Sequence, residues 1–239
     1  MIIIPARLAS TRFPNKILAD IFGLPMVIRT AKAVERIDDV AIATDSDEVV
    51  RVAAKYGIKA ILTSANHQSG TDRINEAAQK LALKENEIVI NVQADEPFIE
   101  QDIVLSLRQR VEELARANDW VMASCYKKIS KQDALDPNLV KVVVDAEQNA
   151  VYFSRCPIPY DRENTQSEYR GHLGLYGFTF KSLQTFCASE SAPLENIEKL
   201  EQLRALYFGK KISMIEVKSR SFGIDTREDL EKALKTFGG

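Results

Sequence analysis

The sequence predicts an α/β fold in which helices cover both faces of a mostly parallel sheet. Short apolar runs alternate with segments whose apolar residues recur at helical spacing, which is typical of strands joined by crossover helices. Of the 239 residues, 45% are hydrophobic and 28% are charged, and this composition excludes a disordered tail, a collagen-like chain and a disulfide scaffold. A single hydrophobic core is near its upper limit at this length, so we expect one domain, residues 1–239, with an excursion.

The alternation is clearest in the first half of the chain. We expect strands at residues 1–5, 40–44, 59–62, 88–92 and 121–125, and helices at residues 25–36, 47–56, 71–83 and 99–116. Ligands of such sheets bind outside the carboxyl ends of the strands. The loops that follow Ile4, Thr44, Leu62 and Val92 are therefore where we expect chemistry.

The rhythm changes after Tyr126. We expect, in order, a hairpin of residues 141–145 and 150–154, a polar loop at 161–170, a strand at 172–180, a helix at 181–188, a helix at 196–208 that Gly209 ends, and a strand at 212–217. The last helix starts at Asp225 and Thr226, and Glu228 and Asp229 place acids in its first turn.

Charge and cysteine content limit the partners of the protein. Lys and Arg number 32 and Asp and Glu number 34, so the formal net charge is −2, which argues against binding to nucleic acid or to a membrane surface. Three cysteines without CxxC spacing are typical of reduced thiols. The apolar run at residues 1–4 is too short for a signal peptide, and no run reaches the ~18 residues of a membrane span. We therefore expect a cytoplasmic protein with no nucleic-acid or membrane partner.

The loop after the first predicted strand, residues 5–16, has the character of a phosphate site. It contains Arg7, Arg12, Lys16 and several hydroxyl groups, but no acidic residue. A triphosphate needs fixed positive charge and free hydrogen-bond donors. The loop contains no glycine, which excludes a Walker A loop and a GxGxxG turn. The alternative is an ordinary solvated basic loop.

Two acidic segments have the chemistry of a magnesium site. Asp95 and Glu96 follow the apolar strand at residues 88–92, and carboxylates there suit Mg²⁺ together with substrate phosphates. Asp225 offers a second carboxylate for the same ion if it faces the cleft. The alternatives are helix N-terminal acids at 95–96 and an N-cap at Asp225.

Two further groups have the chemistry to contact an organic substrate. Ser69, Gly70 and Thr71 precede a predicted helix; their free N–H donors suit a base edge or a phosphate, or they only cap that helix. Arg155 and His172 lie on neighbouring predicted strands and could clamp a carboxylate. A structural histidine is the alternative for His172.

Taken together, the motifs resemble the 3-deoxy-manno-octulosonate cytidylyltransferase family over essentially the whole chain. The matching segments are Ile3-Ile4-Pro5-Ala6-Arg7 with Ser10-Thr11-Arg12 and Lys16, Ala43-Thr44-Asp45, His67-Gln68-Ser69-Gly70-Thr71, Asn91-Val92-Gln93 with Asp95-Glu96-Pro97, Lys141-Val142-Val143, Tyr152-Phe153-Ser154-Arg155, His172-Leu173-Gly174, Pro193-Leu194-Glu195, Glu198 to Arg204, and Asp225-Thr226. The resemblance implies a three-layer α/β/α domain like that of nucleotide-diphospho-sugar transferases. It implies transfer of CMP from CTP to the anomeric hydroxyl of 3-deoxy-D-manno-octulosonate (Kdo), giving CMP-Kdo and pyrophosphate for lipopolysaccharide assembly. It also implies Mg²⁺ and a homodimer.

The resemblance implies roles for individual residues as well. Catalysis falls to Arg7, Arg12, Lys16, Asp95 and Asp225, and the last two hold the metal. Nucleotide binding falls to Ala6, Arg7, Lys16, Ser69, Gly70, Thr71, Arg73 and Gln93, and sugar binding to Arg155, His172, Tyr176, Glu198, Glu201 and Gln202. Ala94 departs from the glycine that is usual in the family. Residues 126–180 and 193–209 are the excursion expected to build the dimer contact and the sugar site, where Leu200, Leu203 and Tyr207 either face a partner or pack inward.

Other functions share some of these features. The 8-amino analogue of Kdo is an alternative substrate, and a sugar-1-phosphate nucleotidylyltransferase has the same architecture. A nucleotide-sugar glycosyltransferase would be expected to carry a DxD-type motif, whereas this chain has Asp95-Glu96-Pro97. A non-catalytic regulator would bind CTP without releasing pyrophosphate.

Overall fold

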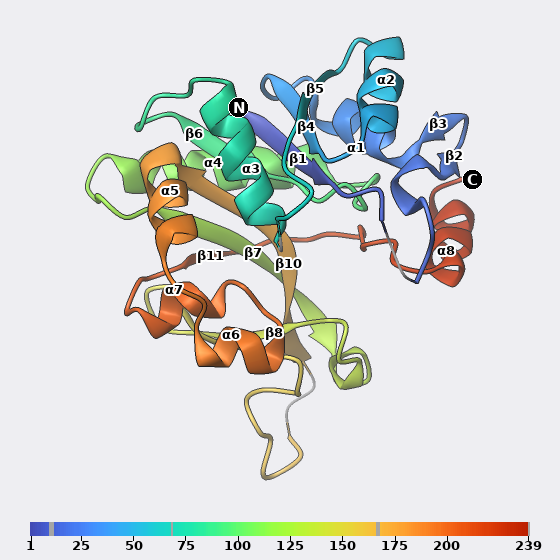
Figure 1. Ribbon diagram of the computed structural model, residues 1–239. Helices are drawn as coiled ribbons and strands as arrows, with labels where there is room; N and C mark the ends of the chain where they lie inside the picture. The colour runs from blue at the N-terminus through green and yellow to red at the C-terminus, as the bar shows by residue number, and fades with distance from the viewer. Residues whose placement is uncertain (10–11, 68, 166–167, 239) are drawn as a thin grey trace.

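The structure is a computed structural model that describes residues 1–9, 12–67, 69–165 and 168–238. Its core is a mixed sheet with the strand order β11-β7-β10-β6-β1-β4-β5 (Figure 1). Four neighbouring strands of this sheet are parallel to one another: β1 (Ile2–Ala6), β4 (Val40–Thr44), β5 (Lys59–Leu62) and β6 (Ile88–Asn91). These strands confirm the predicted α/β class, and β4 and β5 have the predicted bounds.

The other half of the sheet is organised around one reversed strand. β10 (Glu168–Thr179) runs antiparallel to β6 and to β7 (Met122–Ser130), and β11 (Ser213–Glu216) pairs in parallel with β7. Both β7 and β10 extend beyond the predicted strands, and the loop predicted at 161–170 is wrong from Glu168 onward. The charged residues of this stretch face outward while Tyr169 and Ile129 are buried between them, so the segment lacks a continuous apolar run.

Helices cover both faces of the sheet, which makes three layers. One face carries α1 (Met26–Val34), α2 (Asp47–Lys55) and α4 (Gln101–Ala115), and the other carries α3 (Gly70–Lys80) and α5 (Phe180–Ala188). Successive residues of β1 serve the two sides: Ile2 and Ile4 pack with the first group and Ile3 with the second. Each of these isoleucines is fully buried and stabilises the fold by about 2 kcal/mol.

The excursion contains the predicted hairpin, and the structure confirms it as β8 (Lys141–Val144) and β9 (Ala150–Ser154), which join the sheet where β8 pairs with β10 (Figure 1). The single helix predicted at 196–208 is wrong. The segment forms α6 (Pro193–Glu198) and α7 (Leu203–Tyr207), separated by Lys199, which has a left-handed φ of 54°. Leu200 and Leu203 are both buried, so they pack inward and keep an apolar spacing across the break. Tyr207 is exposed.

The C-terminal helix α8 (Arg227–Phe237) packs beside a hairpin of β2 (Asp20–Ile21) and β3 (Leu24–Pro25) that the sequence pattern did not indicate (Figure 1). The N-cap of α8 is Thr226, whose Oγ1 accepts a 3.1 Å hydrogen bond from the amide of Asp229. The alternative of an N-cap at Asp225 is therefore wrong, and its carboxylate is available elsewhere. Among the helices of the described ranges, none has the length and apolar character needed to cross a membrane.

Candidate active site

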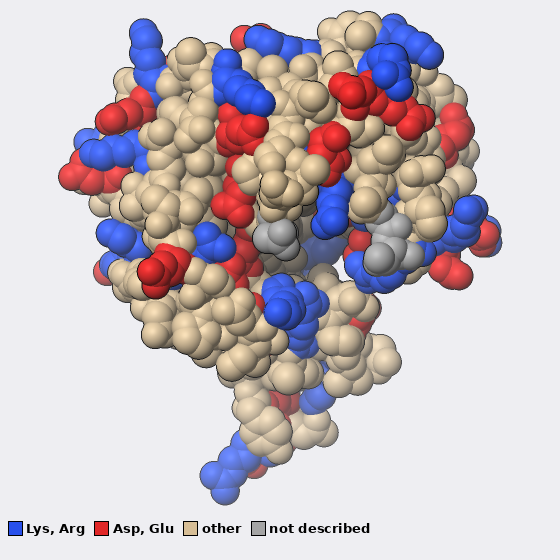
Figure 2. All heavy atoms as spheres, viewed as in Figure 1, with Lys and Arg blue, Asp and Glu red and all other residues tan. Residues whose placement is uncertain are grey.

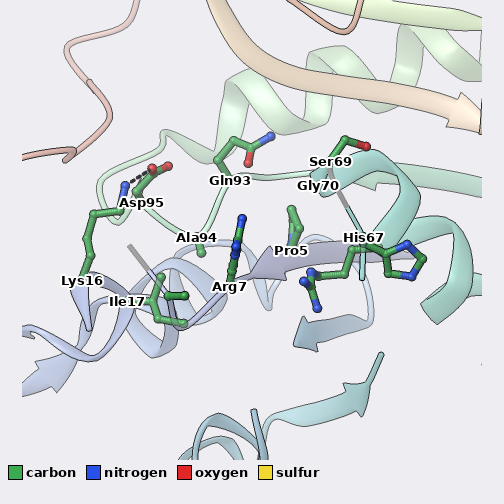
Figure 3. A pocket seen from close by; sticks show the side chains of 12 residues that line it. Pro5, Arg7, Lys16, Ile17, His67, Ser69, Gly70, Gln93, Ala94 and Asp95 are labelled. Carbon is green, nitrogen blue, oxygen red and sulfur yellow. Dashed lines mark hydrogen bonds and ion pairs between the residues drawn. The ribbon is translucent and has the colours of Figure 1, made fainter. Parts of the chain in front are cut away.

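A cleft of about 240 Å³ opens where β1 and β6 end, at the edge of the sheet where ligands are expected. Its lining comes from the basic loop, from the start of α3 and from the loop after β6: Pro5, Arg7, Ala9, Lys16, Ile17, His67, Ser69, Gly70, Arg73, Gln93, Ala94 and Asp95 (Figure 3). Both basic and acidic side chains gather around a hollow on this face of the molecule (Figure 2). The cleft thus combines positive charge with free polar groups, as a phosphorylated ligand requires.

Lys16 is the centre of an ion-pair network at one end of the cleft. Its Nζ donates to Asp95 Oδ2 at 2.6 Å and to Asp225 Oδ1 at 2.8 Å, and Arg12 donates to Asp225 Oδ2 at 2.9 Å. Burial by itself would lower the pKa of Lys16, but the two carboxylates outweigh it and raise that pKa. Burial likewise opposes ionisation of Asp225, but Lys16 and Arg12 keep its pKa below the usual value. These shifts keep Lys16 and Asp225 charged at neutral pH.

The same geometry fits a hard divalent cation. Asp95 and Asp225 come from segments far apart in the sequence, yet their oxygens converge on the single ammonium of Lys16. Two carboxylates plus substrate phosphates are the donor set that Mg²⁺ usually takes. Ala94 is compatible with the loop because its backbone lies outside the left-handed region and its carbonyl accepts a 2.9 Å hydrogen bond from Thr30 Oγ1.

The other end of the cleft is formed by the start of α3. Ser69 caps the helix by accepting a 3.1 Å hydrogen bond from Asp72 N, so the capping interpretation is confirmed, and Ser69 also lines the cleft. A side chain at Gly70 would place its Cβ 3.2 Å from Pro5 Cγ, which explains why glycine suits this close approach. Ala6 is fully buried behind the lining, and Gln93 Nε2 donates to Gly174 O at 3.3 Å.

Arg73 is buried in the wall of the cleft. Its main partner there is Asp45, to which the sequence analysis assigned no role. The Arg73 guanidinium donates to Asp45 Oδ2 at 2.9 Å and to Thr63 Oγ1 at 2.8 Å. Asp45 ends the Ala43-Thr44-Asp45 motif, directly after the carboxyl end of β4. Its place at the edge of the sheet where ligands bind could have indicated its role from the sequence. The motif residues Ser10, Thr11 and Gln68 lie outside the described residues.

The sugar-side candidates divide into two groups, and Glu201, Gln202 and Tyr176 form the first. Thr71 Oγ1 donates a hydrogen bond to Glu201 Oε1, which joins the start of α3 to the segment between α6 and α7. Burial raises the pKa of Glu201, and burial together with the Glu201 charge raises the pKa of Tyr176. Gln202, which follows Glu201 in the chain, is buried as well.

Arg155 and Glu198 contact each other, whereas His172 has different partners. Arg155 donates to the carbonyl oxygens of Glu198 at 2.7 Å and Pro137 at 3.0 Å, and Glu198 accepts from Ser154 Oγ at 2.7 Å. His172 Nε2 lies 2.8 Å from Ser124 Oγ, and its ring packs against Phe153. Burial lowers the pKa of His172 to about 3, so the ring is neutral at physiological pH.

The chain is similar to known cytidylyltransferases over nearly its whole length. Residues 1–212 match the family described as cytidylyltransferase. The 3-deoxy-manno-octulosonate cytidylyltransferase of Wolinella succinogenes is 57% identical, with 100% of this chain and 99% of that protein covered. The protein of the same name from Helicobacter pylori strain 26695 is 51% identical, with 99% and 97% covered.

Solved structures give the same result. The CMP:2-keto-3-deoxy-manno-octonic acid synthetase in complex with CTP superposes with a TM-score of 0.88 at 37% identity, covering 99% of this chain and 97% of that chain. The 4-diphosphocytidyl-2C-methyl-D-erythritol synthase of Anaerococcus prevotii has a TM-score of 0.62 at 15% identity, with 100% and 98% covered, and shares the fold alone.

Proposed function

Because the chain belongs to the 3-deoxy-manno-octulosonate cytidylyltransferase family, and is a nucleotidyltransferase, we propose that it transfers CMP from CTP to the anomeric hydroxyl of Kdo. The products are CMP-Kdo and pyrophosphate. The observation that carries this proposal within the molecule is the pair of contacts from Lys16 to Asp95 and Asp225, which joins the basic loop to a two-carboxylate site.

CTP occupies the cleft with its phosphates toward the basic loop. Arg7, Arg12 and Lys16 neutralise the triphosphate, and a charge-assisted hydrogen bond to phosphate is about twice as strong as a neutral one. The nucleoside lies at the start of α3, against Ser69, Gly70, Thr71 and Arg73, with Ala6 and Gln93 as the floor. Arg73 is held in place by Asp45, so the wall is fixed before the ligand arrives.

The sugar lies on the other side of the α-phosphate. Tyr176, Glu201 and Gln202 are its proposed contacts, together with neutral His172. Arg155 and Glu198 support this side because they hold the turn between α6 and α7 through the carbonyl and carboxylate contacts of Glu198. Thr71 links both substrates because it lies at the nucleotide end of α3 and bonds Glu201.

The reaction is an in-line displacement at the α-phosphorus. The anomeric hydroxyl attacks, the bond to the bridging oxygen breaks, and pyrophosphate leaves. Both substrates are anions, so positioning and charge neutralisation carry most of the catalysis. Arg12 and Lys16 balance the charge that develops on the leaving pyrophosphate. Asp95 and Asp225 would hold Mg²⁺, which would supply charge neutralisation and would lower the pKa of the attacking hydroxyl.

We further propose that the protein acts as a homodimer through its excursion. Ile197 on α6 is 78% exposed, and Val151, Tyr160, Tyr207 and Phe208 from the same part of the chain are exposed as well. Exposed apolar side chains that gather into one patch favour burial against another protein, and we propose that these residues contribute to such a patch. Residues 126–180 and 193–209 thus serve both the sugar site and the dimer contact within a single domain.

The location and the pathway follow from the chemistry. The three cysteines Cys125, Cys156 and Cys187 are free thiols, which suits the reducing cytoplasm, where CTP is made. CMP-Kdo made there is an activated sugar for lipopolysaccharide assembly.

Product analysis tests the function against its alternatives. Wild-type protein with CTP, Mg²⁺ and Kdo is expected to give CMP-Kdo, identified by mass spectrometry, and one equivalent of pyrophosphate. A sugar-1-phosphate nucleotidylyltransferase would instead consume a sugar phosphate and give a nucleoside diphosphate sugar. If the protein bound CTP but released no pyrophosphate with either Kdo or a sugar phosphate, the result would contradict the proposal and favour a regulator.

A further inference from the structure

The carboxylate of Asp225 is carried by residues 217–226, a segment that forms neither helix nor strand. We propose that Glu96 and Glu100 are positioning residues that hold this segment against the loop after β6, so that Asp225 and Asp95 converge on one cation. This inference rests on the proposed function, because it explains how the two-carboxylate site is assembled. Neither glutamate contacts Lys16 or belongs to the lining of the cleft.

Glu96 holds the middle of the segment from inside the protein. Its Oε2 accepts a 2.6 Å hydrogen bond from Ser221 Oγ, and the two residues are 9% and 0% exposed. Loss of the hydrogen-bond partner of a buried carboxylate costs free energy, so this contact restrains both residues 217–226 and the loop after β6. A Cβ on Gly223 would lie 3.7 Å from Glu96 Oε1, an ordinary van der Waals distance, so the segment passes close to Glu96 at this position as well.

Glu100 holds the start of the segment with both carboxylate oxygens. Oε2 accepts from Ser219 Oγ at 2.8 Å, and Oε1 accepts from the amide of Arg220 at 2.7 Å. Lys127 of β7 approaches the same segment and donates to Ser221 O at 2.8 Å. Glu96 and Glu100 attract the Lys127 ammonium, although burial outweighs them and lowers the pKa of Lys127.

The end of the segment is fixed in a different way. Ile224 N donates a 2.9 Å hydrogen bond to Asp95 O, and the Ile224 side chain is buried with Ile21, Met26 and Ala233. Asp225 follows directly. The glutamates hold one side of the segment and this apolar anchor holds the other, so the carboxylate of Asp225 has a defined position although no regular element carries it. Partners that orient a metal ligand in this way typically contribute about 10- to 100-fold in metal affinity.

The test compares Glu96→Ala and Glu96→Gln with wild type and with Asp38→Asn. Asp38 is a partly buried carboxylate at the opposite end of β1, where it binds the N-terminal amine and Arg108. Mn²⁺ binding in the presence of CTP is followed by electron paramagnetic resonance, and hydrogen exchange of residues 217–226 by mass spectrometry. Melting temperatures report general loss of stability, and Ser221→Ala removes the same contact if Glu96→Ala fails to fold.

We expect Glu96→Ala to weaken Mn²⁺ binding about tenfold or more and to speed hydrogen exchange of residues 217–226, with CTP affinity in the absence of metal unchanged. Glu96→Gln retains an acceptor oxygen for Ser221, so it should recover most of the metal affinity. Asp38→Asn should lower the melting temperature without changing either readout. If Glu96→Ala matches Asp38→Asn, with wild-type metal binding and exchange, Glu96 is only structural. If wild-type protein binds no Mn²⁺ with CTP, the metal assignment itself fails instead.

Discussion

The backbone amide of Ile224 donates a hydrogen bond of 2.9 Å to the carbonyl oxygen of Asp95. This contact brings the segment before α8 to the end of β6. One residue further on, Asp225 meets Lys16 from the loop after β1. The proposed reaction centre therefore combines the N-terminal loop, the middle of the chain and the C-terminal segment.

The first prediction concerns Asp95. Asp95→Asn keeps the shape of the side chain but removes a charge from the two-carboxylate site, so pyrophosphate release should fall about 100-fold or more. CTP affinity should stay within about threefold, because the basic loop still binds the triphosphate. Asp102→Asn, an exposed carboxylate on α4, is the control and should retain activity. Near-normal turnover of Asp95→Asn at saturating Mg²⁺ would contradict the metal assignment.

The second prediction separates the two substrates at Arg155. Its guanidinium reaches the carbonyl oxygens of Glu198, Pro137 and Lys199, and no smaller side chain reaches all three. Arg155→Ala should raise the KM for Kdo about tenfold and leave the KM for CTP within about twofold. Arg155→Lys should restore little, because one ammonium cannot replace the planar fork. A rise in the KM for CTP alone would place Arg155 on the nucleotide side.

The third prediction is a pH dependence of stability. Burial holds the pKa of His172 at about 3, against 6.5 for a free histidine. Between these values the unfolded chain binds the extra proton, so stability rises with pH across this window and is lost as the pH falls below 6.5. His172→Gln should remove this loss, and its melting temperature should fall about 4 °C less than that of wild type between about pH 7.5 and about pH 5. Equal falls would show that His172 titrates normally.

A different group controls stability at lower pH. Burial opposes ionisation of Glu76, but contacts with Lys80, Ser64 and His67 lower its pKa to about 2. Its contribution is present above the unfolded pKa of 4.5 and is lost as the pH falls from there toward 2. It therefore leaves the window used for His172 undisturbed.

The fourth prediction concerns the dimer. Ile197→Glu places a charge on the exposed apolar surface of α6 and should shift the mass in light scattering from dimer to monomer. Leu105→Glu changes an exposed leucine on α4, outside the excursion, and should leave the mass unchanged. A wild-type monomer, or a dimer that Ile197→Glu does not weaken, would argue against this surface.

The fold was predictable wherever one physical signal dominated. β4 and β5 match their predicted bounds because continuous apolar runs end at polar residues. The predicted helix at 196–208 failed because Leu200 and Leu203 keep helical spacing across a turn. Arg155, from another part of the chain, stabilises this turn through its contacts with Glu198. The reversed direction of β10 follows from pairing partners that no local pattern encodes.

The candidate site was predictable in its charges more than in its geometry. The basic loop and Asp95 could be assigned by their places after β1 and β6. Asp225 stayed ambiguous because an aspartate before the last helix suits either an N-cap or a metal ligand, and only the contact of Thr226 with Asp229 shows that Thr226 is the cap. The roles of Asp45 and Glu96 depend on partners far away in the sequence, Arg73 and Ser221, so spacing alone did not indicate them.

The central claim is the transfer of CMP to Kdo, and pyrophosphate release tests it most directly. The assay contains CTP and Mg²⁺ with Kdo, with the 8-amino analogue, with a sialic acid, or without any sugar. The account predicts release with Kdo and none without a sugar. Pyrophosphate release with the 8-amino analogue alone would support the reaction type and contradict Kdo as the substrate. CTP binding without pyrophosphate release in the presence of any of these sugars would contradict the proposed function as a whole.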